Sequence, residues 1–184
     1  MGSAFAAGLR YTAMSPNLMR VILRGFWFGL SAIALLALLP VIVRETLTST
    51  AFVYGIMLGC FGLGAVGGAL MNANLRARFA NEIIARGAFT LFAVSCTILA
   101  FSTHTVLSGA ALMVTGACWV LALSMFNVTI QLSTPRWVMG RVLALYQTGT
   151  FGGMATGSLV WGAVAETSGP GTALLCAAAL LLIG

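Results

Sequence analysis

The sequence predicts an all-α polytopic membrane protein, on the basis of its composition, its long uncharged tracts and the distribution of its arginines. Hydrophobic residues make up 60% of the 184 residues and charged residues only 7%. Because about a quarter of the residues in soluble domains are charged, this composition excludes an ordinary globular protein. At roughly 20 apolar residues per span, the length allows five or six transmembrane helices.

Three tracts with almost no ionisable side chains indicate where the chain crosses the membrane. They cover residues 46–75, 87–135 and 142–165. At a rise of ~1.5 Å per residue, each tract is long enough for a hydrocarbon core ~30 Å thick, and the middle one is long enough to cross twice. A buried soluble helix is the alternative for one such tract, but it rarely recurs through a whole chain.

The first span is predicted to begin at Ser15 and Pro16, since serine is favoured at a helix N-cap and proline at the first helical position. Residues 1–15 then form a cytoplasmic or interfacial lead-in. Residues 16–184 form a transmembrane half-domain, with spans predicted at 16–43, 51–72, 87–102, 106–133, 142–165 and 172–184.

Polar and helix-breaking residues separate the later spans. The charged segment 72–86 is predicted to be a loop, and the polar cluster 102–105 folds the middle tract into a hairpin. Pro135 ends the fourth span, because proline disfavours helix at the residue before it and cannot continue a helix itself. The last span stops after 13 residues, short of the roughly 20 that a crossing needs.

The arginines predict the orientation of the chain. The net charge of +6 comes from nine arginines and no lysine, against three acids. When loops are counted alternately, only Arg44 falls on one side, and the rest fall on the other: Arg10, Arg20, Arg24, Arg76, Arg78, Arg86, Arg136 and Arg141. The positive-inside rule places this second side, with the N-terminus, in the cytoplasm and the chain in the cell (inner) membrane. No basic face is then left for a nucleic acid.

Glycines recur every fourth residue in two of the predicted spans, at Gly55 and Gly59, Gly64 and Gly68, and Gly149, Gly153 and Gly157. This spacing lets a second helix approach backbone to backbone, which drives helix association in lipid. We interpret both faces as helix-packing surfaces. They either slide during a transport cycle or pack statically.

Uncharged polar and aromatic side chains within the spans are the candidates for a substrate cavity. A polar side chain in a span costs free energy unless it faces protein or water. Asn127 and Gln147 therefore either line a cavity or make hydrogen bonds between helices. Trp119, deep in the fourth span, either stacks on a substrate or packs between helices.

No residue pattern indicates catalysis, a metal or a cofactor. The sequence offers His104 no partner for acid–base chemistry, and it contains no phosphate-cradling loop. The four cysteines are spread singly through apolar tracts, at Cys60, Cys96, Cys118 and Cys176. No acidic residue lies in the middle of a span, so the chain by itself shows no proton relay.

Two stretches resemble a known family. The glycine-rich run at 62–70 (GLGAVGGAL) and the basic segment after it resemble the C-terminal half of a major facilitator superfamily transporter. Residues 127–147 (NVTIQLSTPRWVMGRVLALYQ), continuing through 152–154, are similar to the transmembrane secretion effector branch, which includes enterobactin-exporter-like proteins. The opening at 8–16 is similar to the segment that leads into the seventh helix of that branch.

The resemblance implies a six-helix half, with its last helix truncated, of a twelve-helix carrier that works by alternating access. The partners it implies are the lipid bilayer, a small-molecule substrate and a missing N-terminal six-helix half, in the same full-length chain or in a separate subunit. It assigns Arg76, Arg78 and Arg141 to a cytoplasmic gate. The acidic position of the gate motif is not matched, since 71–74 carries no carboxylate.

Small-molecule efflux is the function that this resemblance implies. The alternative is a non-transporting membrane remnant or assembly partner that packs through its glycine faces. A homo-oligomeric channel would need a helix with a polar stripe along its whole length, which the sequence lacks.

Overall fold

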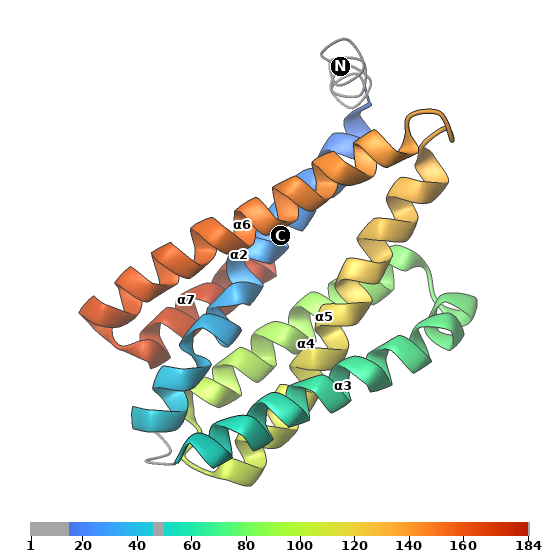
Figure 1. Cartoon of the computed structure of the whole chain (residues 1–184). Coiled ribbons are helices and arrows are strands. Elements are labelled where there is room, and N and C mark those ends of the chain that lie inside the picture. The colour runs from blue at the N-terminus through green and yellow to red at the C-terminus, as the bar shows by residue number, and fades with distance from the viewer. Residues whose placement is uncertain (1–14, 46–49, 184) are drawn as a thin grey trace.

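The computed structural model describes residues 15–45 and 50–183, and the described part is an all-helical bundle without strands (Figure 1). The predicted all-α fold class is therefore confirmed. The lead-in predicted at 1–15 lies outside the described residues except for Ser15, and residues 46–49, between the first two predicted spans, also lie outside them. The helices are α2 (Pro16–Glu45), α3 (Ala51–Arg78), α4 (Asn81–Phe101), α5 (Thr105–Ser133), α6 (Met139–Ser168) and α7 (Pro170–Ile183).

Four of these helices, α2, α3, α4 and α5, are long and apolar enough to cross a membrane. Helix α6 has 30 residues but a lower apolar content, because glycine and threonine are frequent in it. Helix α7 is highly apolar but has only 14 residues. The bundle thus has the composition of a polytopic membrane protein.

The segment 72–86 is largely helical, whereas the sequence predicted a loop there. Helix α3 continues to Arg78 and α4 begins at Asn81. Only Phe79 and Ala80 have extended backbone, with φ/ψ of −126°/146° and −63°/144°. Alanine, leucine and arginine are good helix formers, and Glu82 in the first turn of α4 interacts favourably with the helix dipole. The charges therefore mark the end of the apolar part of each helix but do not end the helix.

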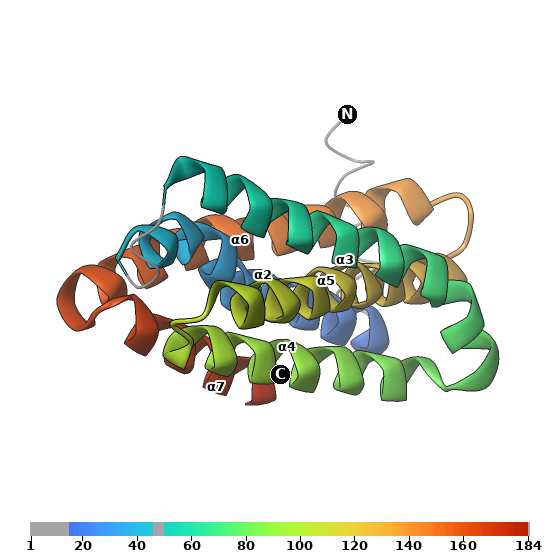
Figure 2. The ribbon, with the colours of Figure 1, turned by 90° about the horizontal axis from the view of Figure 1, so that it is seen from below.

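The helices pack as two principal pairs. Helix α2 packs most extensively on α6, and α3 packs on α5. Figure 2 shows α3 and α6 on one side of the bundle, α4 and α7 on the other side, and α2 and α5 between them. Helix α4 contacts α5 and α7, and α7 contacts α2 and α6, so α4 and α7 together join the two pairs.

Glycines bring the helices of each pair into backbone contact. A Cβ atom on Gly64 or Gly68 would lie only 2.7 Å from the Cα of Met113 or Ala117 of α5. On α6, a Cβ on Gly149 would lie 3.3 Å from the Ile22 side chain, and one on Gly153 or Gly157 would collide with the α2 carbonyls of Phe26 or Leu30. By contrast, a Cβ on Gly55 or Gly59 would have no neighbour within 4 Å in residues 15–45 and 50–183. The packing role of these two glycines stays a prediction.

Aromatic rings fill the space between the pairs. Phe28 of α2 is fully buried, and its ring centroid lies 5.1 Å from that of Phe89 and 5.7 to 6.2 Å from those of Phe92, Trp119 and Phe126. These separations are in the favourable range for tilted and edge-to-face pairs. We call these five residues the aromatic core, and it joins α2, α4 and α5.

The arginines gather at one end of the bundle. The start of α2, the end of α3, the start of α4, the end of α5 and the start of α6 lie together (Figure 1). This arginine-rich end carries Arg20, Arg24, Arg76, Arg78, Arg86, Arg136 and Arg141, whereas Arg44 lies at the far end of α2.

Candidate functional site

An ion cluster joins α2 to α4 at the arginine-rich end. Arg24 donates two hydrogen bonds to the Glu82 carboxylate, from Nη1 to Oε2 at 2.8 Å and from Nη2 to Oε1 at 3.0 Å. The Nε atom of Arg86, one turn after Glu82, also donates to Oε1 at 3.0 Å. Two-point arginine–carboxylate contacts fix geometry as well as charge. This Arg24–Glu82–Arg86 cluster therefore links α2 to α4 at the arginine-rich end.

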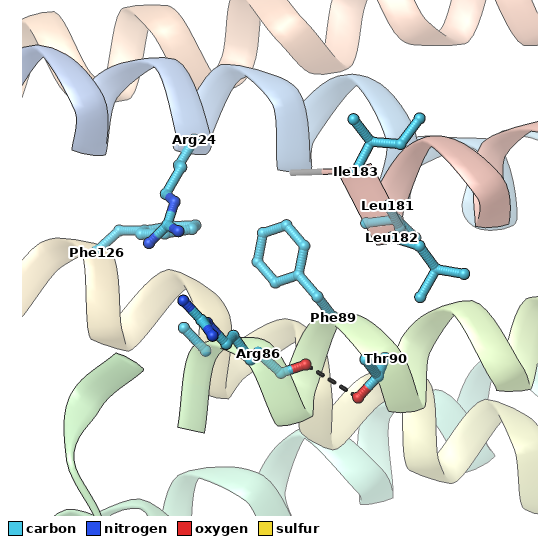
Figure 3. A pocket seen from close by; sticks show the side chains of 9 residues that line it. Arg24, Arg86, Phe89, Thr90, Phe126, Leu181, Leu182 and Ile183 are labelled. Carbon is cyan, nitrogen blue, oxygen red and sulfur yellow. Dashed lines mark hydrogen bonds between the residues drawn. The ribbon is translucent and has the colours of Figure 1, made fainter. Parts of the chain in front are cut away.

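The cluster borders the mouth of a cavity of about 370 Å³. Figure 3 shows Arg24 reaching from α2 toward α4 and Phe89 pointing back from α4, with Phe126 of α5 beside them. The lining consists of Arg24, Ala85, Arg86, Phe89, Thr90, Phe126, Leu181, Leu182 and Ile183. The cavity thus has cationic groups on one side and an aromatic and aliphatic wall on the other.

The three substrate-cavity candidates lie elsewhere in the bundle. Asn127 is half-buried, and its Nδ2 donates to the Leu123 carbonyl of the same helix at 2.8 Å. Gln147 is exposed on α6. Trp119 lies in the aromatic core and also contacts Phe61, at a centroid distance of 5.9 Å. The structure does not bring these residues together in the 370 Å³ cavity, and their contact with a substrate stays a prediction.

The gate candidates differ in their surroundings. Arg78 and Arg141 are exposed, whereas Arg76 is half-buried, and its buried Nε atom has no hydrogen-bond partner among the described residues. One turn before Arg76, Asn72 donates from Nδ2 to Ser124 Oγ of α5 at 2.7 Å. Asn72 Oδ1 is also buried, and no residue in the described part of the chain donates to it. This end of the α3–α5 pair is therefore joined by a neutral hydrogen bond, with no acid beside Arg76 on its own helix turn.

Breaking the Asn72–Ser124 hydrogen bond should destabilise the α3–α5 pair by a modest amount. For the cycle of Asn72→Ala, Ser124→Ala and the double variant, we expect a coupling free energy of about 0.6 kcal/mol, the average for interhelical hydrogen bonds in membranes. Unfolding in mixed micelles by denaturing detergent measures it. Strictly additive single effects would show that this hydrogen bond contributes nothing to stability.

Glu82 and Asn72 are site residues that the sequence did not identify, although both had a recognisable signal. Glu82 is the only acid in the charged segment 72–86, and Asn72 follows Gly68 by four residues, which places it on the same face of α3. Neither pattern identifies the partner on another helix.

The bundle of long apolar helices, with its arginines at one end and glycines between paired helices, defines a polytopic membrane protein. The chain belongs to the transmembrane secretion effector family of the major facilitator superfamily, because the model of that family matches residues 1–184. This superfamily is a class of transporters and not of enzymes. Comparison with curated proteins gave no match, and comparison with solved structures gave none either.

Proposed function

We propose that the chain is the C-terminal six-helix half of a secondary carrier that exports a small molecule by alternating access. The family match over residues 1–184 is the observation that carries this proposal. The two-pair packing of the helices supports it, because a half that rocks against another half must move as one body.

We further propose that the arginine-rich end faces the cytoplasm, with the chain in the inner membrane and its N-terminus inside. Because successive helices run in opposite directions, seven described arginines lie at this end and Arg44 lies at the other. The positive-inside rule then sets the orientation. In that orientation Arg76, Arg78 and Arg141 lie where a cytoplasmic gate acts.

The partner in this proposal is an N-terminal six-helix half that covers α3. Only 17% of the most apolar 18-residue stretch of α3 is buried within the described bundle. The corresponding share is 44 to 56% for α2, α4 and α5. The exposed surface includes the open positions Gly55 and Gly59 and the apolar side chains Phe52, Leu63, Val66 and Leu70. The alternative, a non-transporting assembly partner, would use the same surface.

Transport by a full-length parent that contains this half tests the proposal. We expect Asn127→Ala and Gln147→Ala each to raise the KM for efflux about fivefold, which corresponds to the ~1 kcal/mol of one lost hydrogen bond. The measurement is substrate-dependent efflux from proteoliposomes of inverted and right-side-out orientation. Gln131→Ala is the matched control, because Gln131 is an exposed polar residue at the end of α5.

The outcomes separate the alternatives. Wild-type kinetics in both variants would remove Asn127 and Gln147 as substrate contacts but leave the carrier in place. A parent that inserts and folds but moves no compound from a broad set of small molecules would favour the assembly partner.

A further inference from the structure

We propose that an apolar groove between α3, α4 and α5 holds one acyl chain of an anionic phospholipid, with the lipid headgroup at Arg78. The groove has a volume of about 210 Å³. The chain continues beyond both ends of each of these three helices, so no end of the chain bounds the groove. Lipid binding here is independent of transport and requires only that the bundle lies in a membrane.

The groove forms because α3 and α4 both pack on α5 but hardly on each other. Figure 2 shows α5 lying between them. One wall is formed by Leu75 and Phe79 of α3, the other by the 83–91 face of α4, and the floor by Cys118 and Leu121 of α5. Because Phe79 directly follows α3 in the linker to α4, one end of the groove lies at the arginine-rich end of the bundle.

The length and volume of the groove suit one hydrocarbon chain. Its α4 wall runs from Ile83 to Leu91, which is ~12 Å along the helix axis. A hydrocarbon core ~30 Å thick gives each leaflet ~15 Å, so the groove lies within the leaflet at the arginine-rich end. Sites for drug-sized ligands have volumes of roughly 300–1,000 Å³. The smaller groove therefore accommodates a segment of chain rather than a compact molecule.

The chemistry of the lining favours hydrocarbon over a polar ligand. Among the described residues that line the groove, Cys118 alone has a polar side-chain group, and a thiol is a weak hydrogen-bonding group. A polar ligand would therefore lose its hydrogen bonds to water without replacement. On the outer side of α4, Ile83, Leu91 and Val94 are 53 to 59% exposed. Lipid covers such an apolar surface in a membrane, and the groove is continuous with it through Ile83 and Leu91.

The charge at the arginine-rich end of the groove favours an anionic headgroup. Arg78 is exposed, and it lies three residues after Leu75 and directly before Phe79. This spacing places Arg78 beside the groove, because residues three and four apart are neighbours on a helix surface. Glu82, the nearest acid in the sequence, already pairs with two other arginines. The guanidinium group of Arg78 is thus placed to bind a lipid phosphate, whose oxygens match its geometry.

Photo-crosslinking in proteoliposomes tests the proposal. The probes are phosphatidylglycerol and phosphatidylcholine with the same diazirine-labelled acyl chain, and mass spectrometry of peptides locates the label. We expect label at 83–91 and 118–121, about fivefold more from phosphatidylglycerol, which corresponds to the ~1 kcal/mol of one basic side chain near a headgroup. Arg78→Gln should remove this difference. Arg136→Gln, which changes another exposed arginine of the same end, should keep it.

A side chain that fills the groove provides a second arm. Gly87 lies between Ile83 and Leu91 on the same face of α4, and a Cβ there would meet none of the described residues within 4 Å. Gly87→Phe should therefore fit, occupy the groove and abolish labelling of 118–121 by both lipids. Gly62→Phe is the matched control, because it adds the same ring at an open glycine of α3 outside the groove. It should leave the labelling unchanged.

Several results would overturn the proposal. They are label spread evenly over the exposed apolar residues of the helices, equal labelling of the groove by the two lipids, and equal effects of Gly87→Phe and Gly62→Phe in protein whose elution volume and Tm show that it is folded. If Gly87→Phe does not fold, Arg78→Gln decides, since its position is exposed. Loss of the groove label in a full-length parent would also overturn the proposal, because another part of the protein would then fill the groove. None of these measurements depends on transport, so the proposed carrier function can fail or hold independently.

Discussion

Gly64→Leu should disrupt the α3–α5 pair and lower the free energy of unfolding by about 3 kcal/mol or more, at the upper end of what overpacking costs. The added side chain has no space, because even a Cβ atom at Gly64 collides with the Met113 carbonyl and lies 2.7 Å from the Met113 Cα. The obstacle is backbone, which cannot rotate away as a side chain can. Helices α3 and α5 must therefore separate, which also loses the close approach of Gly68 to Ala117 and that of Gly116 on α5 to Phe61 on α3. Denaturing-detergent titration and elution behaviour measure the effect.

Gly62→Leu provides the matched control for this substitution. Gly62 lies on the same helix, two residues away, and a Cβ atom added there would have none of the described residues within 4 Å. The same change in helix propensity applies at both sites, so any difference between them reports packing. If Gly62→Leu were as destabilising as Gly64→Leu, the close approach of α3 and α5 would be wrong.

Phe28→Ala should cost about 3–5 kcal/mol in the free energy of unfolding, the range for removal of a buried aromatic ring. Phe28 has no exposed surface and contacts four other rings of the aromatic core. In a membrane the lost stabilisation comes from ring contacts and the cavity left behind, because lipid supplies little hydrophobic drive. The unfolding midpoint in denaturing detergent measures the loss.

Phe151→Ala is the control for the ring removal. Phe151 of α6 is 64% exposed and lies outside the aromatic core, so its removal should change the unfolding midpoint little. Equal losses for Phe28→Ala and Phe151→Ala would show that α2, α4 and α5 do not share a packed core.

The sequence predicts the fold class well, because hydrophobic tracts of spanning length are a direct requirement of the bilayer. It predicts the ends of the helices less well. The charges in 72–86 indicate where the apolar surface ends, but helices tolerate arginine and glutamate, so α3 and α4 extend through most of that segment.

Glycine spacing likewise predicts which faces permit close packing but not which are in contact. Gly64 and Gly68 lie against α5, whereas Gly55 and Gly59, with the same spacing on the same helix, lie against open space. A periodic pattern belongs to one helix, and contact depends on where the neighbouring helix crosses it.

The candidate site was the least predictable part. Arg24 and Glu82 are 58 residues apart in the chain, and nothing local to either one specifies the other. Their pairing follows from the position of α4 against α2, which depends on the aromatic core between them. Similarly, the sequence shows Asn72 only as part of a segment, 71–74, that lacks the carboxylate of the gate motif. Its hydrogen bond to Ser124 follows from the register of α3 on α5.

Cysteine accessibility in whole cells tests most directly whether the chain crosses the membrane with its arginine-rich end inside. The background replaces Cys60, Cys96, Cys118 and Cys176, and single cysteines are introduced at the exposed positions Ala80, Thr103 and Arg136. A membrane-impermeant maleimide should label Thr103→Cys in intact cells, and Ala80→Cys and Arg136→Cys only after permeabilisation. Labelling of Ala80→Cys and Arg136→Cys from opposite sides of the membrane would contradict the topology and the carrier assignment with it.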